Sequence, residues 1–394
     1  MNDAARCPAC RAGAMQVFHE QHAVPVNSCV LVPERTDALT FPTGRIRLAW
    51  CAGCGFVSNL DFDPALAEYS ARYEETQAYS ARFVSFARDL AHRWVDAYGL
   101  AGRSVLEIGC GKGEFLTLMV GAGVGRATGI DPGLAVDRID PAVDGRVEWI
   151  TDFYSERYAR LSADAVVCRH TLEHIGPVAD FMRMIRANIG DRLDTVVLFE
   201  VPDVQRVLDE VAFWDVYYEH CSYFTAGSLE RLFRATGFDV LAVESVFDDQ
   251  YLLIEARPEA GSKGPRPPGT GEDDIHTVRT GAARLAADYR RKIGEWQSTV
   301  AEVAERRGRT VVWGAGSKGV AFLTALGGNV IEYAVDVNPH KHGMYMAGTG
   351  QRIVPPTFMK EYRPDLVIAM NPIYRGEIKR DLDELGVEAD LVAV

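Results

Sequence analysis

The first long periodic segment of the chain runs from about residue 64 to residue 98. Its apolar residues recur three or four positions apart, or at multiples of these spacings, which indicates one face of an α-helix. They are Leu66, Tyr69, Tyr73, Phe83, Phe86, Leu90 and Trp94. Asp63 and Pro64 suit the N-cap and the first turn of such a helix. We therefore predict a helix here, with Tyr73 and Tyr79 either in its core face or turned toward a ligand.

Short apolar segments alternate with helical segments over the middle of the chain. We predict strands at residues 104–108, 127–131, 147–150, 163–168 and 195–199, with a helix at 114–122. Strands that alternate with helices indicate a mainly parallel, doubly wound sheet. In such α/β sheets the ligand binds beyond the carboxyl ends of the strands.

A second unit of the same α/β class is predicted nearer the C-terminus. Its strands are expected at 310–313, 331–335 and 366–369, after a long helix with a polar face at about 275–306. Residues 258–274 are rich in Pro, Gly and charge, which is typical of a linker or an exposed loop. The expected domains are an N-terminal module of residues 1–62, a central domain of residues 63–257 and, after the linker, a C-terminal domain of residues 275–394.

Composition and charge narrow the classes of function. Hydrophobic residues make up 47% of the 394 residues and charged residues 25%, which is typical of a globular protein. A formal net charge of −13 argues against a nucleic-acid partner, because that affinity comes mainly from Lys and Arg. No stretch approaches the roughly 20 apolar residues of a membrane span, and the N-terminus does not read as a signal peptide. We expect a cytoplasmic protein with no membrane partner.

Four of the eight cysteines form two C-x2-C pairs, Cys7 with Cys10 and Cys51 with Cys54. The short spacing lets two thiolates bind one ion, and the second pair completes a tetrahedron. A segment this short has little core of its own, so a metal would supply stability. We predict a structural Zn²⁺ site with a hairpin-like insert between the pairs; redox-active or simply buried thiols are the alternative. Cys29 is expected to be a small buried residue.

A glycine loop, E-I-G-C-G-K-G, follows the first central strand. Its glycines let the backbone approach a ligand beside the N-terminus of the next helix. Acids end the next two strands, where one can accept ribose hydroxyls and the other an adenine amino group, with a neighbouring aromatic covering the ring. The candidate cofactor-binding residues are Glu107, Gly109, Gly111, Gly113, Asp131, Asp152 and Phe153. The pattern predicts a nucleoside site, and the spacing is not that of a phosphate-binding GxxxxGK[ST] loop.

This pattern resembles the class I S-adenosylmethionine-dependent methyltransferases. The resemblance implies a seven-stranded, Rossmann-like sheet in the central domain. It also implies that Gly109 and Gly111 approach the methionine moiety and that Asp131 holds the ribose. Asp152 and Phe153 would frame the adenine. The alternative, a nicotinamide site, fits less well because the loop lacks the spacing that binds a pyrophosphate.

Two later segments carry candidate residues for the methyl acceptor. After the fourth strand, in R-H-T-L-E-H-I, His170 and His174 share one face of a helical turn. A metal pair there would need more ligands, so we expect His174 to line the pocket or act as an acid or base, with a structural histidine as the alternative. Residues 213–224 crowd aromatics, acids and His220 together. Histidine is the natural base near neutral pH, although an aromatic core cluster is the alternative reading.

The whole chain resembles the nucleotide-sugar C-methyltransferases of deoxysugar biosynthesis. The resemblance rests on the order of the cysteine module, the methyltransferase domain, Y-x-E-H-x-S-Y-F and G-A-G-x-K-G. It implies proton abstraction beside a ketone, followed by attack of the enolate on the sulfonium methyl. His220 would be the base, with Tyr217 and Glu219 beside it. His174 would lie across the site, near the enolate oxygen.

Two positions depart from the pattern of that family. Tyr218 stands where a histidine is common, and Glu173 precedes His174 where a small residue is common. A different acceptor therefore stays open, and the alternative is an O- or N-methyltransferase acting on a sugar or another secondary metabolite. A non-catalytic adenosine-binding scaffold is a further alternative. A histidine–glutamate–tyrosine group favours carbon, because a ketone α-proton needs a real base.

A second glycine loop, residues 314–319, matches GxGxxG after a strand. Asp336 follows its last glycine by 17 positions, near the expected distance of about 20. Taken alone, the loop predicts NAD and a dehydrogenase. The family resemblance implies instead a domain that closes over the acceptor, where Ser317 and Lys318 meet a phosphate of a nucleotide-linked substrate. Residues 338–341 would extend that wall or form an exposed turn.

Overall fold

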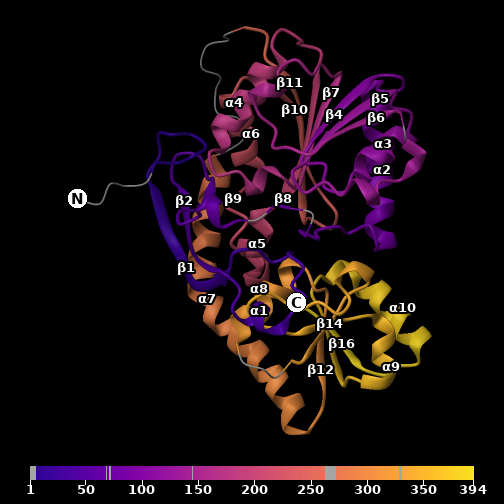
Figure 1. The fold of residues 1–394 in the computed structure, drawn as a ribbon. Coiled ribbons are helices and arrows are strands. Elements are labelled where there is room, and N and C mark those ends of the chain that lie inside the picture. Colours follow the sequence, from indigo (N-terminus) through magenta and orange to yellow (C-terminus); the bar gives the residue numbers. More distant parts are fainter. Residues whose placement is uncertain (1–5, 68, 71, 144, 262–271, 328–330) are drawn as a thin grey trace.

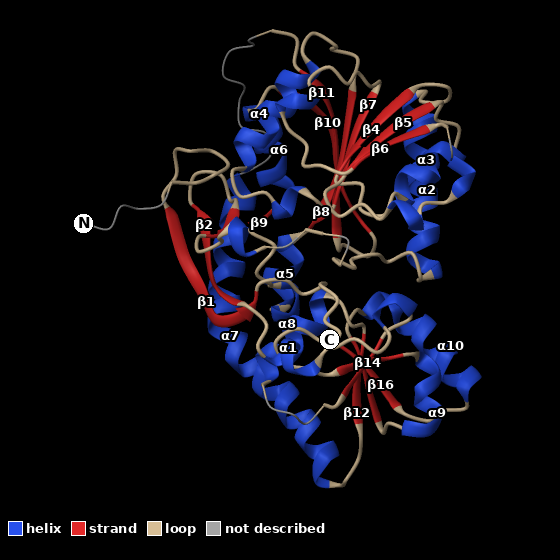
Figure 2. Cartoon of the chain, viewed as in Figure 1, coloured by secondary structure: helices blue, strands red, loops and turns tan. Residues whose placement is uncertain are grey.

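The computed structural model describes residues 6–67, 69–70, 72–143, 145–261, 272–327 and 331–394. Three sheets organise these residues (Figures 1 and 2). Their strand orders are β1-β2-β3-β9, β10-β11-β8-β7-β4-β5-β6 and β14-β13-β12-β15-β16. The second and third sheets are mainly or wholly parallel, so the α/β fold class is confirmed.

The central sheet has seven strands, five of them parallel. The parallel strands are β4 (Ser104–Ile108), β5 (Arg126–Ile130), β6 (Val147–Ile150), β7 (Ala165–Arg169) and β8 (Val196–Pro202). Antiparallel strands β11 (Tyr251–Pro258) and β10 (Phe238–Val246) extend it beyond β8, and these two were not predicted. The inner strands are nearly continuous apolar runs because both faces are buried.

Helices cover both faces of the central sheet. The helices of this part of the chain are α2 (Ala81–Tyr98), α3 (Glu114–Gly121), α4 (Val178–Ile189), α5 (Val204–Glu210) and α6 (Ala226–Ala235). Trp94 and Leu116, from α2 and α3, pack with Val105 on one face. Met182 and Leu232, from α4 and α6, pack with the other face. Successive side chains of each strand point to opposite faces of the sheet, so each strand contributes side chains to both cores.

The predicted helix over residues 64–98 is wrong for its first half. Only a 3-10 turn at Pro64–Leu66 and helix α2 form, and the Ser80 hydroxyl caps α2 by accepting the Phe83 N–H at 3.2 Å. The segment between them pairs with the N-terminal part of the chain instead. The N–H of Glu74 donates to the carbonyl of Cys29 at 2.8 Å. Hydrogen bonds to a distant segment have therefore replaced the local helical ones.

The N-terminal sheet joins two distant parts of the chain. A long antiparallel hairpin of β1 (Met15–Pro25) and β2 (Thr43–Cys51) lies between the two cysteine pairs, and helix α1 (Arg35–Leu39) lies in its connection. Strand β3 (Val57–Asn59) pairs with β2 on one side and with β9 (Ser222–Tyr223) on the other. Strand β9 comes from the segment predicted to carry the catalytic histidine.

The C-terminal sheet is parallel throughout. Its strands are β12 (Thr310–Trp313), β13 (Tyr333–Val335), β14 (Arg352–Val354), β15 (Leu366–Ala369) and β16 (Asp390–Ala393). Its helices are α8 (Ser317–Leu326), α9 (Met359–Tyr362) and α10 (Arg375–Leu385).

The long helix predicted before this sheet is confirmed as α7 (Glu272–Glu305). It runs beside α5 and β1 toward the C-terminal sheet, as Figure 1 shows. Most of the predicted linker, residues 262–271, lies outside the described residues. Among the described helices, none combines the length and the apolar character needed to cross a membrane.

Candidate active site

A cavity of about 1450 Å³ lies between the carboxyl ends of the central parallel strands and the C-terminal sheet. Three segments meet in its wall. They are the cofactor loop (residues 107–113), the acceptor segment (residues 213–224) and the C-terminal glycine loop (residues 314–319). Tyr73 and Tyr79 also line it, so both face the cavity rather than only a core. The carboxyl ends of parallel strands thus form the site, as expected for this fold class.

The cofactor loop is packed so closely that two of its glycines have no room for a side chain. A Cβ on Gly109, whose φ is +70°, would lie 2.0 Å from the Thr171 hydroxyl oxygen. A Cβ on Gly113, whose φ is +80°, would lie 2.5 Å from the Trp149 ring. Gly109 lines the cavity, whereas Gly113 begins helix α3 outside it. Gly113 therefore shapes the loop from behind.

The acids predicted to bind the nucleoside surround this loop. The Asp131 carboxylate accepts the N–H groups of Gly111 and Gly133 at 2.9 and 2.6 Å, which fixes its position in the cavity wall. Glu107 is buried, and burial raises its pKa to about 8. One buried Glu107 oxygen has no hydrogen-bond partner among the described residues. A protonated carboxyl there would be a donor as well as an acceptor.

The predicted adenine contacts lie at the mouth of the cavity. The Asp152 carboxylate accepts the Phe153 N–H at 2.8 Å and the Tyr158 hydroxyl at 2.6 Å. The Phe153 side chain is 62% exposed although it lines the cavity, so its ring face is open to a planar ligand. An exposed aromatic ring at a cavity mouth suits stacking better than packing.

The acceptor segment brings three of the predicted catalytic residues together. The ring centroids of Tyr217 and His220 are 4.2 Å apart, and those of His174 and His220 are 4.8 Å apart. All three side chains line the cavity. Burial lowers the pKa of both histidines, most strongly that of His220, so both are neutral near pH 7. A neutral imidazole facing a ligand cavity has a lone pair with which to take a proton.

Tyr69 is a cavity residue that the sequence analysis had placed only on a helix face. Its hydroxyl lies 3.0 Å from Nδ1 of His174 and therefore orients that ring. The two residues are 105 positions apart, so no local pattern connected them.

Glu219 lies apart from the other predicted catalytic residues. Its carboxylate accepts the Ser28 N–H at 2.8 Å and the Ser28 hydroxyl as well. Burial raises the pKa of Glu219 to about 7, although both Ser28 contacts oppose the shift. Glu219 does not line the cavity. It ties the acceptor segment to the N-terminal module and positions His220 beside it.

Strand β9 gives the acceptor segment a second attachment to the N-terminal module. The Asn59 N–H and the Ser58 hydroxyl donate to the Cys221 carbonyl at 3.0 and 2.9 Å. The Ser222 hydroxyl donates to the Ile175 carbonyl at 2.7 Å. The two residues after the candidate base are therefore held by hydrogen bonds to the N-terminal module and to residue 175.

Glu200 is a buried acid that the sequence analysis did not single out as a site residue. Its carboxylate accepts two hydrogen bonds from the Arg169 guanidinium, at 3.0 and 3.1 Å, and pairs with Nε2 of His170 at 2.6 Å. Burial alone would lower the pKa of His170, but the carboxylates of Glu200 and Glu173 raise it to about 9. His170 is thus a cation near pH 7 and is not a base.

The four cysteines of the two pairs converge on one point. The Sγ atoms of Cys7 and Cys54 are 3.6 Å apart, as are those of Cys10 and Cys51, and all four lie within 4.8 Å of one another. Zn–S bonds of about 2.3 Å in a tetrahedron put sulfur atoms about 3.8 Å apart. The cluster therefore fits a zinc ion. Cys29 is buried elsewhere, as expected, with its Sγ 3.2 Å from the Ser317 hydroxyl.

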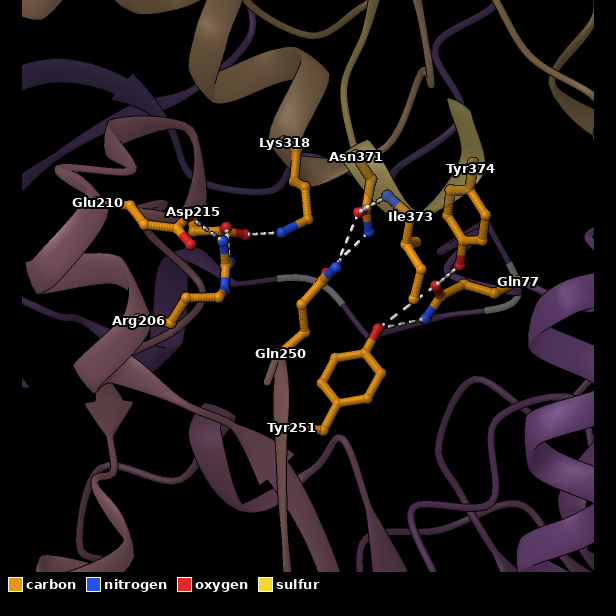
Figure 3. A network of polar contacts seen from close by, with 10 residues as sticks. All are labelled: Gln77, Arg206, Glu210, Asp215, Gln250, Tyr251, Lys318, Asn371, Ile373 and Tyr374. Atoms are coloured by element: carbon orange, nitrogen blue, oxygen red, sulfur yellow. Dashed lines mark hydrogen bonds and ion pairs between the residues drawn. The ribbon is translucent and has the colours of Figure 1, made fainter. Parts of the chain in front are cut away.

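Buried polar pairs join the C-terminal domain to the central domain (Figure 3). Lys318 pairs with Asp215, which also pairs with Arg206. The side-chain amides of Gln250 and Asn371 exchange two hydrogen bonds, at 2.9 and 2.8 Å. Lys318 therefore contacts the acceptor segment directly. The sequence had predicted only a contact with a substrate phosphate for this residue.

The predicted polar turn after Asp336 also lies at the cavity. The Asp336 carboxylate accepts the N–H groups of Ala315 and Asn338, both at 2.8 Å. Asn338 and Lys341 line the cavity and are buried, and the Asn338 amide donates to Glu74 at 2.8 Å. An exposed turn is therefore ruled out for these two residues.

Comparison with known proteins adds two family matches and one relative. Residues 78–243 match the family described as "Methyltransferase domain", and residues 280–389 match the "C-methyltransferase C-terminal domain". C-methyltransferase NovU of Streptomyces niveus is 27% identical over 324 residues, which cover 78% of this chain and 75% of NovU.

Solved methyltransferase structures show a weaker likeness. The 1,6-didemethyltoxoflavin-N1-methyltransferase of Burkholderia thailandensis has a TM-score of 0.36 and 20% identity, over 44% of this chain and 79% of its own. The magnesium protoporphyrin IX methyltransferase of Synechocystis PCC 6803 has a TM-score of 0.36 and 16% identity, over 44% and 83%.

The family matches cover both α/β units, and the first of them spans the cofactor loop and its acids. That loop carries the residues on which the resemblance was founded. The chain is a class I S-adenosylmethionine-dependent methyltransferase.

Proposed function

We propose that the enzyme methylates a carbon atom of a nucleotide-linked keto-deoxysugar through an enolate. The observation that carries this proposal is the neutral, buried imidazole of His220 in the cavity that also holds the cofactor loop. A ketone α-proton needs a positioned base, whereas an O- or N-acceptor needs less help. The match to a C-methyltransferase C-terminal domain and to NovU supports carbon as the acceptor.

In this proposal S-adenosylmethionine supplies an electrophilic methyl group on its sulfonium. Glu107, Gly109, Gly111, Asp131, Asp152 and Phe153 bind it, and Gly113 shapes the loop behind them. His220 takes the α-proton of the acceptor, and the Tyr217 ring beside it fixes the imidazole plane. His174, oriented by Tyr69, lies near the developing enolate oxygen. Holding both partners in one cavity supplies the alignment that methyl transfer requires.

The two remaining parts of the chain have supporting roles in the proposal. Zn²⁺ held by Cys7, Cys10, Cys51 and Cys54 stabilises the N-terminal module, to which the acceptor segment is tied. The C-terminal domain closes the cavity over the acceptor. An anionic nucleotide would meet the N-terminus of α8 and the Lys341 ammonium there, which offsets the negative net charge of the chain.

The test is His220→Ala, assayed with candidate keto-sugars. We expect the variant to bind S-adenosylmethionine as the wild type does and to lose turnover by about 10²–10⁴-fold, the usual contribution of a positioned base. His92→Ala, on the exposed face of α2, is the matched control and should stay active. A fully active His220→Ala variant would refute the catalytic role.

The position of the new methyl group decides between carbon and the alternative acceptors. NMR of the product should place it on the carbon next to the ketone, and solvent deuterium should enter that carbon when the donor is omitted. A methyl group on oxygen or nitrogen would show that the enzyme is an O- or N-methyltransferase instead.

A further inference from the structure

Glu75 is an acid of the cavity wall to which the proposed function gives no role. It lines the cavity, and its side chain is 34% exposed. Its Oε1 atom lies against the cofactor loop, 2.8 Å from the position that a Cβ on Gly111 would take. Its Oε2 atom is buried and has no hydrogen-bond partner among the described residues. Such an oxygen is poorly compensated, because burying a charged group without a partner costs free energy.

The residues on either side of Glu75 keep it beside the loop. The Glu74 N–H donates to the Cys29 carbonyl at 2.8 Å. The Thr76 hydroxyl donates to the carboxylate of Glu114, the first residue of helix α3. The backbone is therefore anchored just before and just after Glu75, and the fold places its carboxylate at the cofactor loop.

The side chains around the cofactor loop carry more negative than positive charge. Four carboxylates line the cavity there, those of Glu75, Glu107, Glu114 and Asp131. The Lys112 ammonium is 3.8 Å from Oε2 of Glu75, too far for a hydrogen bond, and donates to the Gly133 carbonyl at 2.9 Å. Burial raises the pKa of Glu75 to about 7 although Lys112 opposes the shift. Arg138 and Arg169 also line the cavity, but each is paired with another acid. A cationic ligand would therefore balance Glu75 better than the protein does.

Glu75 lies where the middle of the cofactor is expected. Its carboxylate and that of Asp131 both lie beside Gly111, whose N–H the Asp131 carboxylate accepts at 2.9 Å. In the proposed function Asp131 holds the ribose, and Gly109 and Gly111 approach the methionine moiety. The sulfonium sulfur joins the ribose to the methionine chain, so it falls between these contacts. It has no hydrogen to donate, so a carboxylate attracts it through charge alone.

We propose that Glu75 binds the sulfonium of S-adenosylmethionine and makes the site prefer this donor to S-adenosylhomocysteine, the thioether left after transfer. The two molecules differ by one methyl group and one positive charge, so a carboxylate can distinguish them. Transfer of the methyl group neutralises the sulfur, which removes the attraction to Glu75 and favours release of the product. Glu75 therefore selects the donor and does not accelerate the transfer, because the sulfonium charge disperses as the methyl group leaves.

The inference rests on the placement of the ribose and the methionine moiety in the proposed function, and not on the identity of the acceptor. Binding is measured without acceptor or turnover. Asp131→Asn tests the placement, and it should weaken both S-adenosylmethionine and S-adenosylhomocysteine because both contain the ribose. Unchanged binding of both would overturn the placement and this inference with it.

The experiment measures the dissociation constants of S-adenosylmethionine, S-adenosylhomocysteine and sinefungin by calorimetric titration of the full-length protein. Sinefungin has an ammonium-bearing carbon in place of the methylated sulfur. In Glu75→Gln the affinity for the two cationic ligands should fall by at least about tenfold, and that for S-adenosylhomocysteine by less than about threefold. Glu384→Gln removes a carboxylate from an exposed part of the cavity wall and should bind all three as the wild type does.

Urea unfolding shows that each variant is folded. Glu75→Asp, which withdraws the charge by one methylene group, should show a smaller loss of the same selectivity. Equal losses of S-adenosylmethionine and S-adenosylhomocysteine in Glu75→Gln would overturn the proposal, because Glu75 would then serve a group that the two share, such as the α-ammonium. So would unchanged binding of all three ligands, or the same selective loss in Glu384→Gln.

Discussion

Gly109 is the position at which a single methyl group should most directly damage the candidate cofactor site. In Gly109→Ala the new Cβ would lie 2.0 Å from the Thr171 hydroxyl oxygen. It would also lie 2.7 and 2.8 Å from Cγ2 and Cβ of Thr171, so rotating that side chain cannot relieve the overlap. The backbone at φ +70° is in the left-handed region, which any side chain makes less favourable.

The free-energy costs of the backbone conformation and of the steric overlap can each be given a usual size. An alanine in the left-handed region costs about 1–2 kcal/mol. Overpacking a dense site costs about 1–3 kcal/mol. Their sum of about 2–5 kcal/mol is divided between stability, if the loop keeps its shape, and cofactor affinity, if the loop moves away. Since about 1.4 kcal/mol is a factor of ten, even half of the lower sum weakens binding by about fivefold.

The assay combines calorimetric titration with S-adenosylmethionine and urea unfolding of the same preparation. Gly121→Ala is the matched control, because Gly121 ends the next helix with nothing within 4 Å of a new Cβ. That control should bind normally and be as stable as the wild type or slightly more so. If Gly109→Ala matches the wild type in both affinity and stability, the close approach of this loop to Thr171 is not as described.

Three further perturbations test other parts of the structure. Cys54→Ser should lower the zinc content below one ion per chain by elemental analysis, and should lower the melting temperature with it. Glu200→Gln leaves Arg169 and His170 without their buried carboxylate and should cost about 3–5 kcal/mol in urea unfolding. Because the pKa of His170 is raised from 6.5 to about 9, its contribution to stability is complete below pH 6.5 and is lost as the pH rises through 9; this slope should flatten in Glu200→Gln. Asn371→Ala leaves the buried Gln250 amide unpaired and should cost about 1–3 kcal/mol, whereas an unchanged stability would mean that water replaces the lost partner.

The parallel strands and the cofactor loop were predictable because their signals are local. Each strand is a short apolar run, and the glycine loop lies between a strand and a helix. Since the carboxyl ends of parallel strands share one edge, the acids that follow them had to gather there. Strands β10 and β11 were missed because their place in the sheet is set by pairing with β8, and not by a pattern within either segment.

The surroundings of the candidate catalytic residues were not predictable, because they too depend on contacts between distant segments. Ser28 and Glu219 are 191 positions apart, and their contact depends on how the N-terminal module docks. Lys318 and Asp215 come from different domains. The helix predicted over residues 64–98 failed because apolar spacing also suits a segment whose rings face a cavity. Periodicity identifies a buried side but does not say whether a core or a ligand lies against it.

The pairing of β3 with β9 has a consequence for recombination between related enzymes. The strand beside His220 is hydrogen-bonded to residues 57–59, and not to the central sheet that supplies the rest of the domain. A chimera that exchanged only the central domain would join an acceptor segment from one parent to a docking strand from the other. Successful grafts of acceptor preference should therefore keep residues 57–59 and 213–224 from the same parent, although more than 150 positions separate them in the sequence.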